Sequence, residues 1–117
     1  MGSESQRQGK NMANFNVVRL NESPKVPFSL DGRILFTSPE LEVVHLTLKP
    51  GESMDPHIQP FDVLFYVIDG EGDLTVEDES IKAAPGTLIE VKKGTSRRWI
   101  NPGKDNLRMI VLKRIKI

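Results

Sequence analysis

The sequence predicts an all-β protein, because short apolar runs follow the two-residue period of strands and turn signals separate them. Asp31-Gly32 and Pro85-Gly86 are two of these turn signals. No long window repeats its apolar residues at the helical period of about 3.6 residues. Many short strands joined by Gly and Pro turns are typical of an antiparallel β-sandwich, jelly roll or barrel.

The predicted strands follow one another at short intervals. Residues 63–68 read Val-Leu-Phe-Tyr-Val-Ile, a continuous apolar run that predicts a strand buried on both faces. Between residues 13 and 38 the pattern is weaker and predicts one or two edge strands. The predicted strands are residues 34–37, 41–48, 63–68, 74–76, 88–91, 97–100 and 107–112.

The composition predicts one domain without a nucleic-acid or membrane partner. The chain of 117 residues fits a single domain, and 16 basic residues balance 16 acidic ones, so bulk charge favours neither partner. No apolar run is long enough for a membrane helix. The chain has no cysteine, which excludes disulfides and thiolate metal sites and suits a cytoplasmic location. We expect residues 1–12 to be a disordered tail or cloning remnant, and residues 13–117 to form the domain.

Two groups of residues have the spacing of known sequence motifs. The first group is Gly51, His57, Gln59, Val63 and Gly70. The second group is Gly86, Lys92, Gly94, Arg97 and Asn101. This spacing resembles the two motifs of the cupin family and covers roughly residues 34–113. The resemblance implies a cupin-type antiparallel β-barrel, also called a jelly roll or double-stranded β-helix. We expect the glycines to supply positive φ at turns, and Asn101 to form the turn into the last strand.

The metal ligands that the resemblance implies are mostly replaced. Metal-binding cupins supply three histidines and one acid, whereas this chain retains His57 and has Gln59, Val63 and Arg97 at the other positions. Valine has no donor atom, and arginine is always protonated. We therefore predict no tightly bound transition metal and no other cofactor. If a divalent metal is bound, His57 and Gln59 are its ligands.

Two acids near the first motif leave an alternative open. Asp55 or Asp62 would compensate for the missing ligands if the local register differs, and Asp62 is the acid best placed in sequence to orient His57.

The expected ligand-binding pocket is apolar with three polar groups, the usual composition of a small-molecule site. Its residues are Met54, His57, Gln59, Val63, Phe65, Arg97, Trp99, Met109 and Val111. Arg97 favours an anion if it faces the pocket, and the alternative is that it extends outward to solvent. Trp99 and Met109 are also explained by core packing alone. Tyr66 should point away from the pocket.

His45 lies outside both motifs. We expect it on the strand face opposite Val44 and Leu46, as a satisfied or exposed surface residue.

Three functions fit these residues. The first is a metal-independent pocket for a small polar or anionic metabolite. The second is a metal-dependent cupin enzyme of the dioxygenase, decarboxylase or sugar isomerase type, with an atypical His/Gln/Asp ligand set. The third is a non-catalytic structural or regulatory module. The resemblance also implies a homodimer formed by pairing sheets or exchanging an N-terminal strand, for which residues 15–20 are the candidate.

Overall fold

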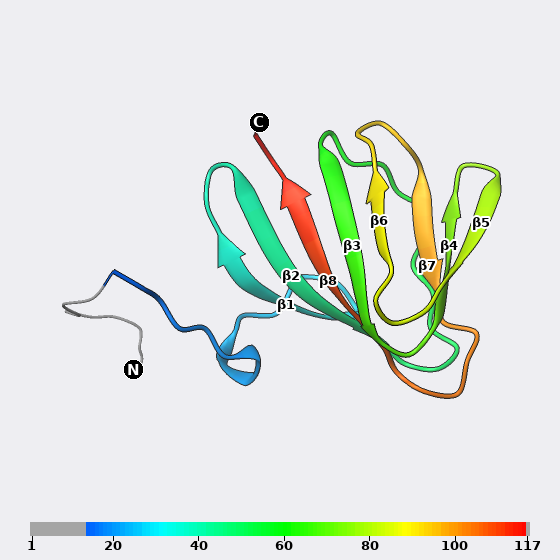
Figure 1. Ribbon diagram of the computed structural model, residues 1–117, viewed down its shortest axis with the longest axis horizontal. Coiled ribbons are helices and arrows are strands. Elements are labelled where there is room, and N and C mark those ends of the chain that lie inside the picture. Colours follow the sequence, from blue (N-terminus) through cyan, green and yellow to red (C-terminus); the bar gives the residue numbers. More distant parts are fainter. Residues whose placement is uncertain (1–13, 117) are drawn as a thin grey trace.

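A computed structural model describes residues 14–116 of the protein, which fold into two antiparallel sheets that face each other (Figure 1). The larger sheet has the strand order β1-β2-β8-β3-β6, and the smaller has the order β5-β4-β7. The elements are η1 (Leu20–Glu22), β1 (Asp31–Thr37), β2 (Leu41–Leu48), β3 (Asp62–Asp69), β4 (Gly72–Val76), β5 (Glu79–Ala83), β6 (Leu88–Val91), β7 (Arg97–Ile100) and β8 (Leu107–Arg114). The predicted all-β jelly roll is thus confirmed.

The predicted strands correspond to observed ones, with one omission. β5 was not predicted, because its sequence is mostly polar and its first four residues are exposed. It forms as the second half of a hairpin with β4, and Glu77 takes a positive φ of 53° in the turn. Residues 15–19 form no strand in the single chain, and η1 begins at Leu20. The exchange of residues 15–20 as a strand between two copies stays a prediction. The predicted tail, residues 1–12, lies outside the described residues.

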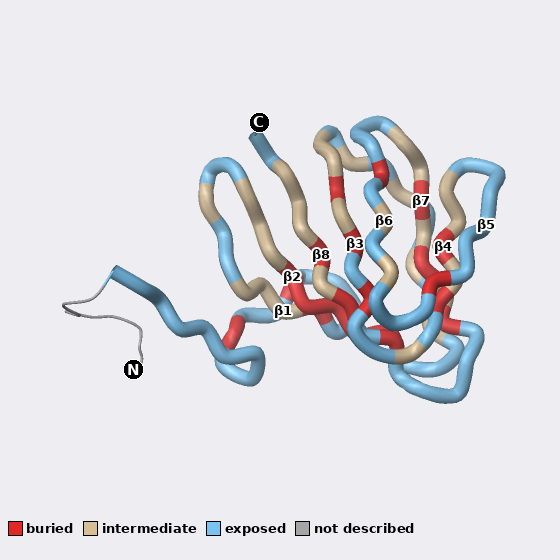
Figure 2. Tube along the Cα trace, in the orientation of Figure 1, coloured by how far each residue is buried: buried red, intermediate tan, exposed pale blue. Residues whose placement is uncertain are grey.

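The core lies between the two sheets. Alternate residues of each strand point inward, including Val63, Phe65 and Val67 of β3, which are at most 3% exposed. Buried positions gather where the strands converge in Figure 2, and the opposite end of the barrel carries more exposed residues. The motif residues His57 and Arg97 belong to this more open end, because Arg97 begins β7 opposite the last residue of β4.

The outer face of β3 departs from the prediction. Tyr66 and Ile68 are each 44% exposed, so the apolar run 63–68 is buried on one face only in the single chain. Leu88 of β6 lies directly opposite Tyr66 and is 57% exposed. The structure therefore leaves an apolar patch on the outer face of the large sheet.

The turns follow the motif spacing. Gly51, Gly70, Gly86 and Gly94 all adopt positive φ, as predicted. Asn101 is fully buried, and its amide donates to the carbonyls of Leu48 and Asp105 while its oxygen accepts from the Gly103 N–H. These bonds confirm its predicted role in the turn before β8. No helix within residues 14–116 has the length and apolar character needed to cross a membrane.

Candidate functional site

Most of the predicted pocket residues meet between the sheets. Val63 and Phe65 come from β3, Met109 and Val111 from β8, and Trp99 from β7, and all belong to one buried cluster. Met54 is partly buried and packs against this cluster. Gln59 is also partly buried, and its backbone carbonyl accepts a hydrogen bond from the Gly94 N–H.

His57 and Arg97 form the polar part of the site. The two residues pair across neighbouring extended segments, and each backbone N–H donates to the other's carbonyl at 3.1 Å. Residues directly opposite each other in an antiparallel pair carry their side chains on the same face. One residue from each motif therefore occupies the same end of the barrel, as the motif spacing implied.

Arg97 is buried and points inward. Its residue is 3% exposed, and its guanidinium lies 5.8 Å from the centre of the Phe65 ring. The Nε and Nη1 atoms are buried and have no hydrogen-bond partner among residues 14–116. Burial lowers the pKa of Arg97 from its ordinary value, which reflects the cost of desolvating its charge. The alternative that Arg97 extends outward to solvent is wrong.

Trp99 adds a third buried donor atom close to the same aromatic ring. Its indole packs edge-on against Phe65, with ring centres 5.6 Å apart and an interplanar angle of 78°. The Nε1 atom is buried and has no hydrogen-bond partner in the part of the chain that the structure describes. Buried donors of this kind are rare in folded proteins, and each calls for an acceptor.

The surroundings of His57 favour the neutral form of its ring. Burial, followed by the positive charge of Arg97, lowers its pKa below the ordinary value of 6.5. The Nδ1 atom lies 3.4 Å from the backbone carbonyl of Asp55. Because a carbonyl only accepts, this contact favours the tautomer with the proton on Nδ1 and leaves Nε2 as an acceptor.

The acids near the motif do not complete a metal site. Asp62 accepts a hydrogen bond from the Lys93 N–H at 2.9 Å, and its other oxygen is 4.0 Å from Arg114. It alternates with the inward residues of β3 and so faces away from His57, which corrects its expected orienting role. The side chain of Asp55 is exposed, and only its carbonyl approaches His57.

The donor set does not fit a tightly held transition metal. Val63 is fully buried at the position of the family's acid, and Arg97 stands where its third histidine would be. Within residues 14–116, no cluster of three or more His, Cys, Asp or Glu side chains could hold a metal ion. A guanidinium at this position would repel a divalent cation.

Two charged residues at the same end were missed in the sequence. Lys113 and Glu42 form an ion pair at 3.3 Å, and their side chains are only 18% and 21% exposed. They lie in one row with Val63 across β2, β8 and β3, on the inward face. Lys113 is close enough to add to the lowering of the His57 pKa. The two-residue period of β2 and β8, continued by one step, would have revealed both residues.

The fold and this site define a small β-barrel that carries His57 from the first motif and Arg97 from the second motif at the same end. A sequence profile of the cupin domain matches residues 44–113. The chain therefore belongs to the cupin family. No curated protein matches the sequence.

Solved structures share the fold at low sequence identity. A predicted oxalate decarboxylase from Thermotoga maritima has a TM-score of 0.76 and 18% identity, over 86% of this chain and 99% of that one. An RmlC-like cupin with a double-stranded β-helix fold from Methanocaldococcus jannaschii has a TM-score of 0.74 and 23% identity, over 87% of this chain and 92% of that one. The polyketide cyclase RemF from Streptomyces resistomycificus has a TM-score of 0.77 and 16% identity, over 87% of this chain and 80% of that one. These likenesses establish the fold alone.

Proposed function

We propose that the protein binds a small anionic metabolite between its sheets without a metal. The observation that carries this proposal is the buried guanidinium of Arg97, two of whose donor atoms lack partners within the described residues 14–116. A buried charge without hydrogen bonds is costly, and an anion would supply both the missing acceptors and the opposite charge. Trp99 offers a further buried donor beside the same phenylalanine ring.

The charges at this end of the barrel support a single negative charge on the ligand. Lys113 is offset by Glu42, at 3.3 Å, and the lowered pKa of His57 keeps its ring neutral at pH 7. Arg97 then leaves one positive charge without a partner among these groups. A monocarboxylate or a similar monoanion matches this balance, and the apolar side chains around Arg97 suit an organic body.

The enzyme and the inert-module alternatives have less support. A metal-dependent reaction requires acids or histidines that the site does not contain, and the low identity to the decarboxylase-like and cyclase structures transfers no activity. An inert barrel would gain nothing from a buried arginine with unpartnered donors, since an apolar residue there would pack at lower cost.

A thermal-shift screen of carboxylates, phosphates and sulfonates at matched ionic strength tests the proposal. A ligand at 100 times its dissociation constant should add about 2.7 kcal/mol, which raises the midpoint by about 10 °C or more in a domain of this size. The same compound should shift Arg97→Met much less than wild type, and it should shift Arg98→Met as much as wild type, because Arg98 is the next residue of β7 and points to the other face. Failure of every anion, or equal shifts in wild type and Arg97→Met, would contradict the proposal.

We also propose that the protein is a homodimer in the cytoplasm. Within residues 14–116, two apolar surfaces lack a cover. One is the patch around Tyr66 and Leu88, and the other is the extended N-terminal segment, whose Phe15, Val17 and Val18 are each more than 50% exposed. The segment leaves the body of the molecule, as Figure 1 shows. Two copies could cover both surfaces without any other partner. The absence of cysteine suits the reducing cytoplasm.

Light scattering at micromolar concentration tests the dimer. Wild type should have twice the mass of the chain, and Leu88→Lys should shift it towards monomer, because a charge on this patch opposes burial. Lys82→Glu on the exposed strand β5 is the matched control and should remain dimeric. A monomeric wild-type protein would rule the dimer out.

A further inference from the structure

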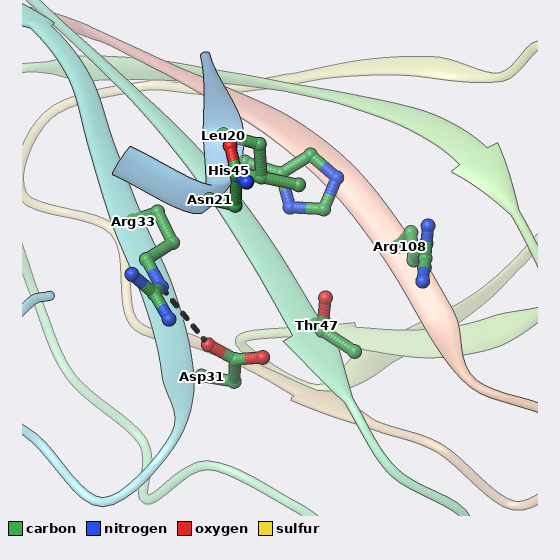
Figure 3. Close-up of a pocket in the computed structure, with 7 residues that line it drawn as sticks. All are labelled: Leu20, Asn21, Asp31, Arg33, His45, Thr47 and Arg108. Carbon is green, nitrogen blue, oxygen red and sulfur yellow. Dashed lines mark ion pairs between the residues drawn. The ribbon is translucent and has the colours of Figure 1, made fainter. Parts of the chain in front are cut away.

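A second polar cleft lies on the outer face of the large sheet, away from the residues between the sheets (Figure 3). Its volume is about 190 Å³. The 3₁₀ helix η1 forms one wall, and side chains from three strands form the floor. These floor residues are Asp31, Arg33, His45, Thr47 and Arg108.

The strand register gathers these side chains. Thr47 of β2 lies directly opposite Asp31 of β1 on one side and Arg108 of β8 on the other. One step along the sheet, His45 lies opposite Arg33. Residues in register across neighbouring strands share a face, so the five side chains form one compact polar group.

The residues around η1, from Arg19 to Ser23, are fixed over this group. Arg33 donates through Nη1 to the Ser23 carbonyl at 2.9 Å, and the Ser23 hydroxyl donates to the Arg19 carbonyl at 2.9 Å. His45 and Thr47 are consequently only 9% and 8% exposed, although they point away from the core. His45 is on the face that the sequence predicted, but it is buried rather than exposed.

The cleft carries one uncompensated positive charge. Arg33 is offset by Asp31, whose carboxylate is 3.7 Å from its Nε atom. Arg108 is exposed and forms no ion pair within the described part of the chain, residues 14–116. Burial, and then the charge of Arg108, lower the pKa of His45, so its ring is neutral at pH 7.

We propose that this outer cleft binds a small oxyanion, a phosphate or carboxylate group, between Arg108, Thr47 and His45. The guanidinium supplies charge and paired N–H donors, the hydroxyl supplies a third donor, and the imidazole ring turns toward Arg108 in Figure 3. Asn21 of η1 adds an amide at the opposite wall. The site is independent of the one proposed between the sheets.

Binding at this cleft should be linked to protonation of His45. The charged groups that line the cleft around it are Asp31 and Arg33 of β1 and Arg108 of β8, and η1 contributes none. A bound anion offsets the charge of Arg108, which favours the protonated ring. The apparent pKa of His45 should therefore rise on binding, and affinity should increase as the pH falls through the range in which the ring becomes protonated.

NMR titration with inorganic phosphate, and in parallel with acetate, tests the inference at constant ionic strength. The chain has two histidines, so His57→Gln assigns the ring signals of His45. We expect a saturable change in these signals with at least one of the two anions, and an apparent pKa of His45 that rises with its concentration.

Three variants separate this site from the rest of the protein. Arg108→Gln should weaken binding by about tenfold or more, because it removes a charge-assisted contact. Arg98→Gln on the smaller sheet is the matched control and should bind as wild type does. Arg97→Met should also keep this site, even if anion binding between the sheets fails. A response that does not saturate, or that persists unchanged in Arg108→Gln, would overturn the inference.

Discussion

Replacing Arg97 with methionine should raise the unfolding midpoint of the ligand-free protein and abolish anion binding between the sheets. The guanidinium is buried with Nε and Nη1 unpartnered, which costs about 1–3 kcal/mol for each unsatisfied group. Its contact with Phe65 offsets part of this cost, by about 0.5–2 kcal/mol. Methionine fills similar space without a charge, so we expect a net gain of about 1 kcal/mol or more, which is about 4–8 °C in the midpoint.

Calorimetry of the wild-type, Arg97→Met and Arg98→Met proteins provides the measurement. Arg98→Met should change the midpoint little, because Arg98 is partly exposed on the opposite face of β7. If Arg97→Met is more stable than wild type but no longer binds the anion, the role of Arg97 is to bind the ligand and not to stabilise the fold. A midpoint of Arg97→Met several degrees below that of wild type would show that the arginine supports the fold, and would remove the argument for an anion.

Gly70→Ala should cause the largest loss of stability among the motif glycines. Gly70 has a φ of +77°, and an added Cβ would collide with the backbone oxygen of Asn106, just before β8. Neither the turn nor the neighbouring backbone can move without disturbing the central strands β3 and β8. We expect a loss of more than about 4 kcal/mol, or about 20 °C in the midpoint, which approaches the whole stability of a small domain.

Gly51→Ala is the matched control for this prediction. Gly51 has a similar φ of +85°, but an added Cβ meets no atom within 4 Å. The stability of Gly51→Ala should therefore fall only by the backbone penalty of a positive φ, about 1–2 kcal/mol. Urea unfolding measures the stability of both variants. Equal losses of stability would contradict the prediction, because they would show that the positive φ alone, and not the clash with Asn106, requires glycine at position 70.

The sequence was sufficient to predict the fold because its signals are local. Turn glycines and the two-residue period define where strands start and end, and they gave β2, β6 and β7 at their observed bounds. β5 could not be predicted in this way, because its residues are polar and exposed and the hairpin with β4 holds it in place. The same limit applies to η1, whose position depends on contacts with β1 such as that of Arg33 with Ser23.

The sequence predicted which residues belong to the candidate site, but not how their side chains are buried and paired. The motif spacing identified His57 and Arg97, and strand alternation would have extended the group to Lys113 and Glu42. The orientation of Arg97, and the lack of partners for its Nε and Nη1 atoms among the described residues, depend on how the two sheets enclose it. Such burial arises from residues far apart in sequence, which no local pattern encodes. The burial of His45 under the N-terminal segment has the same origin.

The metal content of the protein, expressed and purified without chelators, tests the central claim most directly. The claim is that Val63 and Arg97 have replaced metal ligands, so that this cupin site holds an anion instead. Elemental analysis should find iron, nickel, manganese and zinc far below one equivalent per chain, because His57 and Gln59 alone do not form a tight site. A near-stoichiometric amount of any of these metals that is lost in His57→Ala would contradict the account.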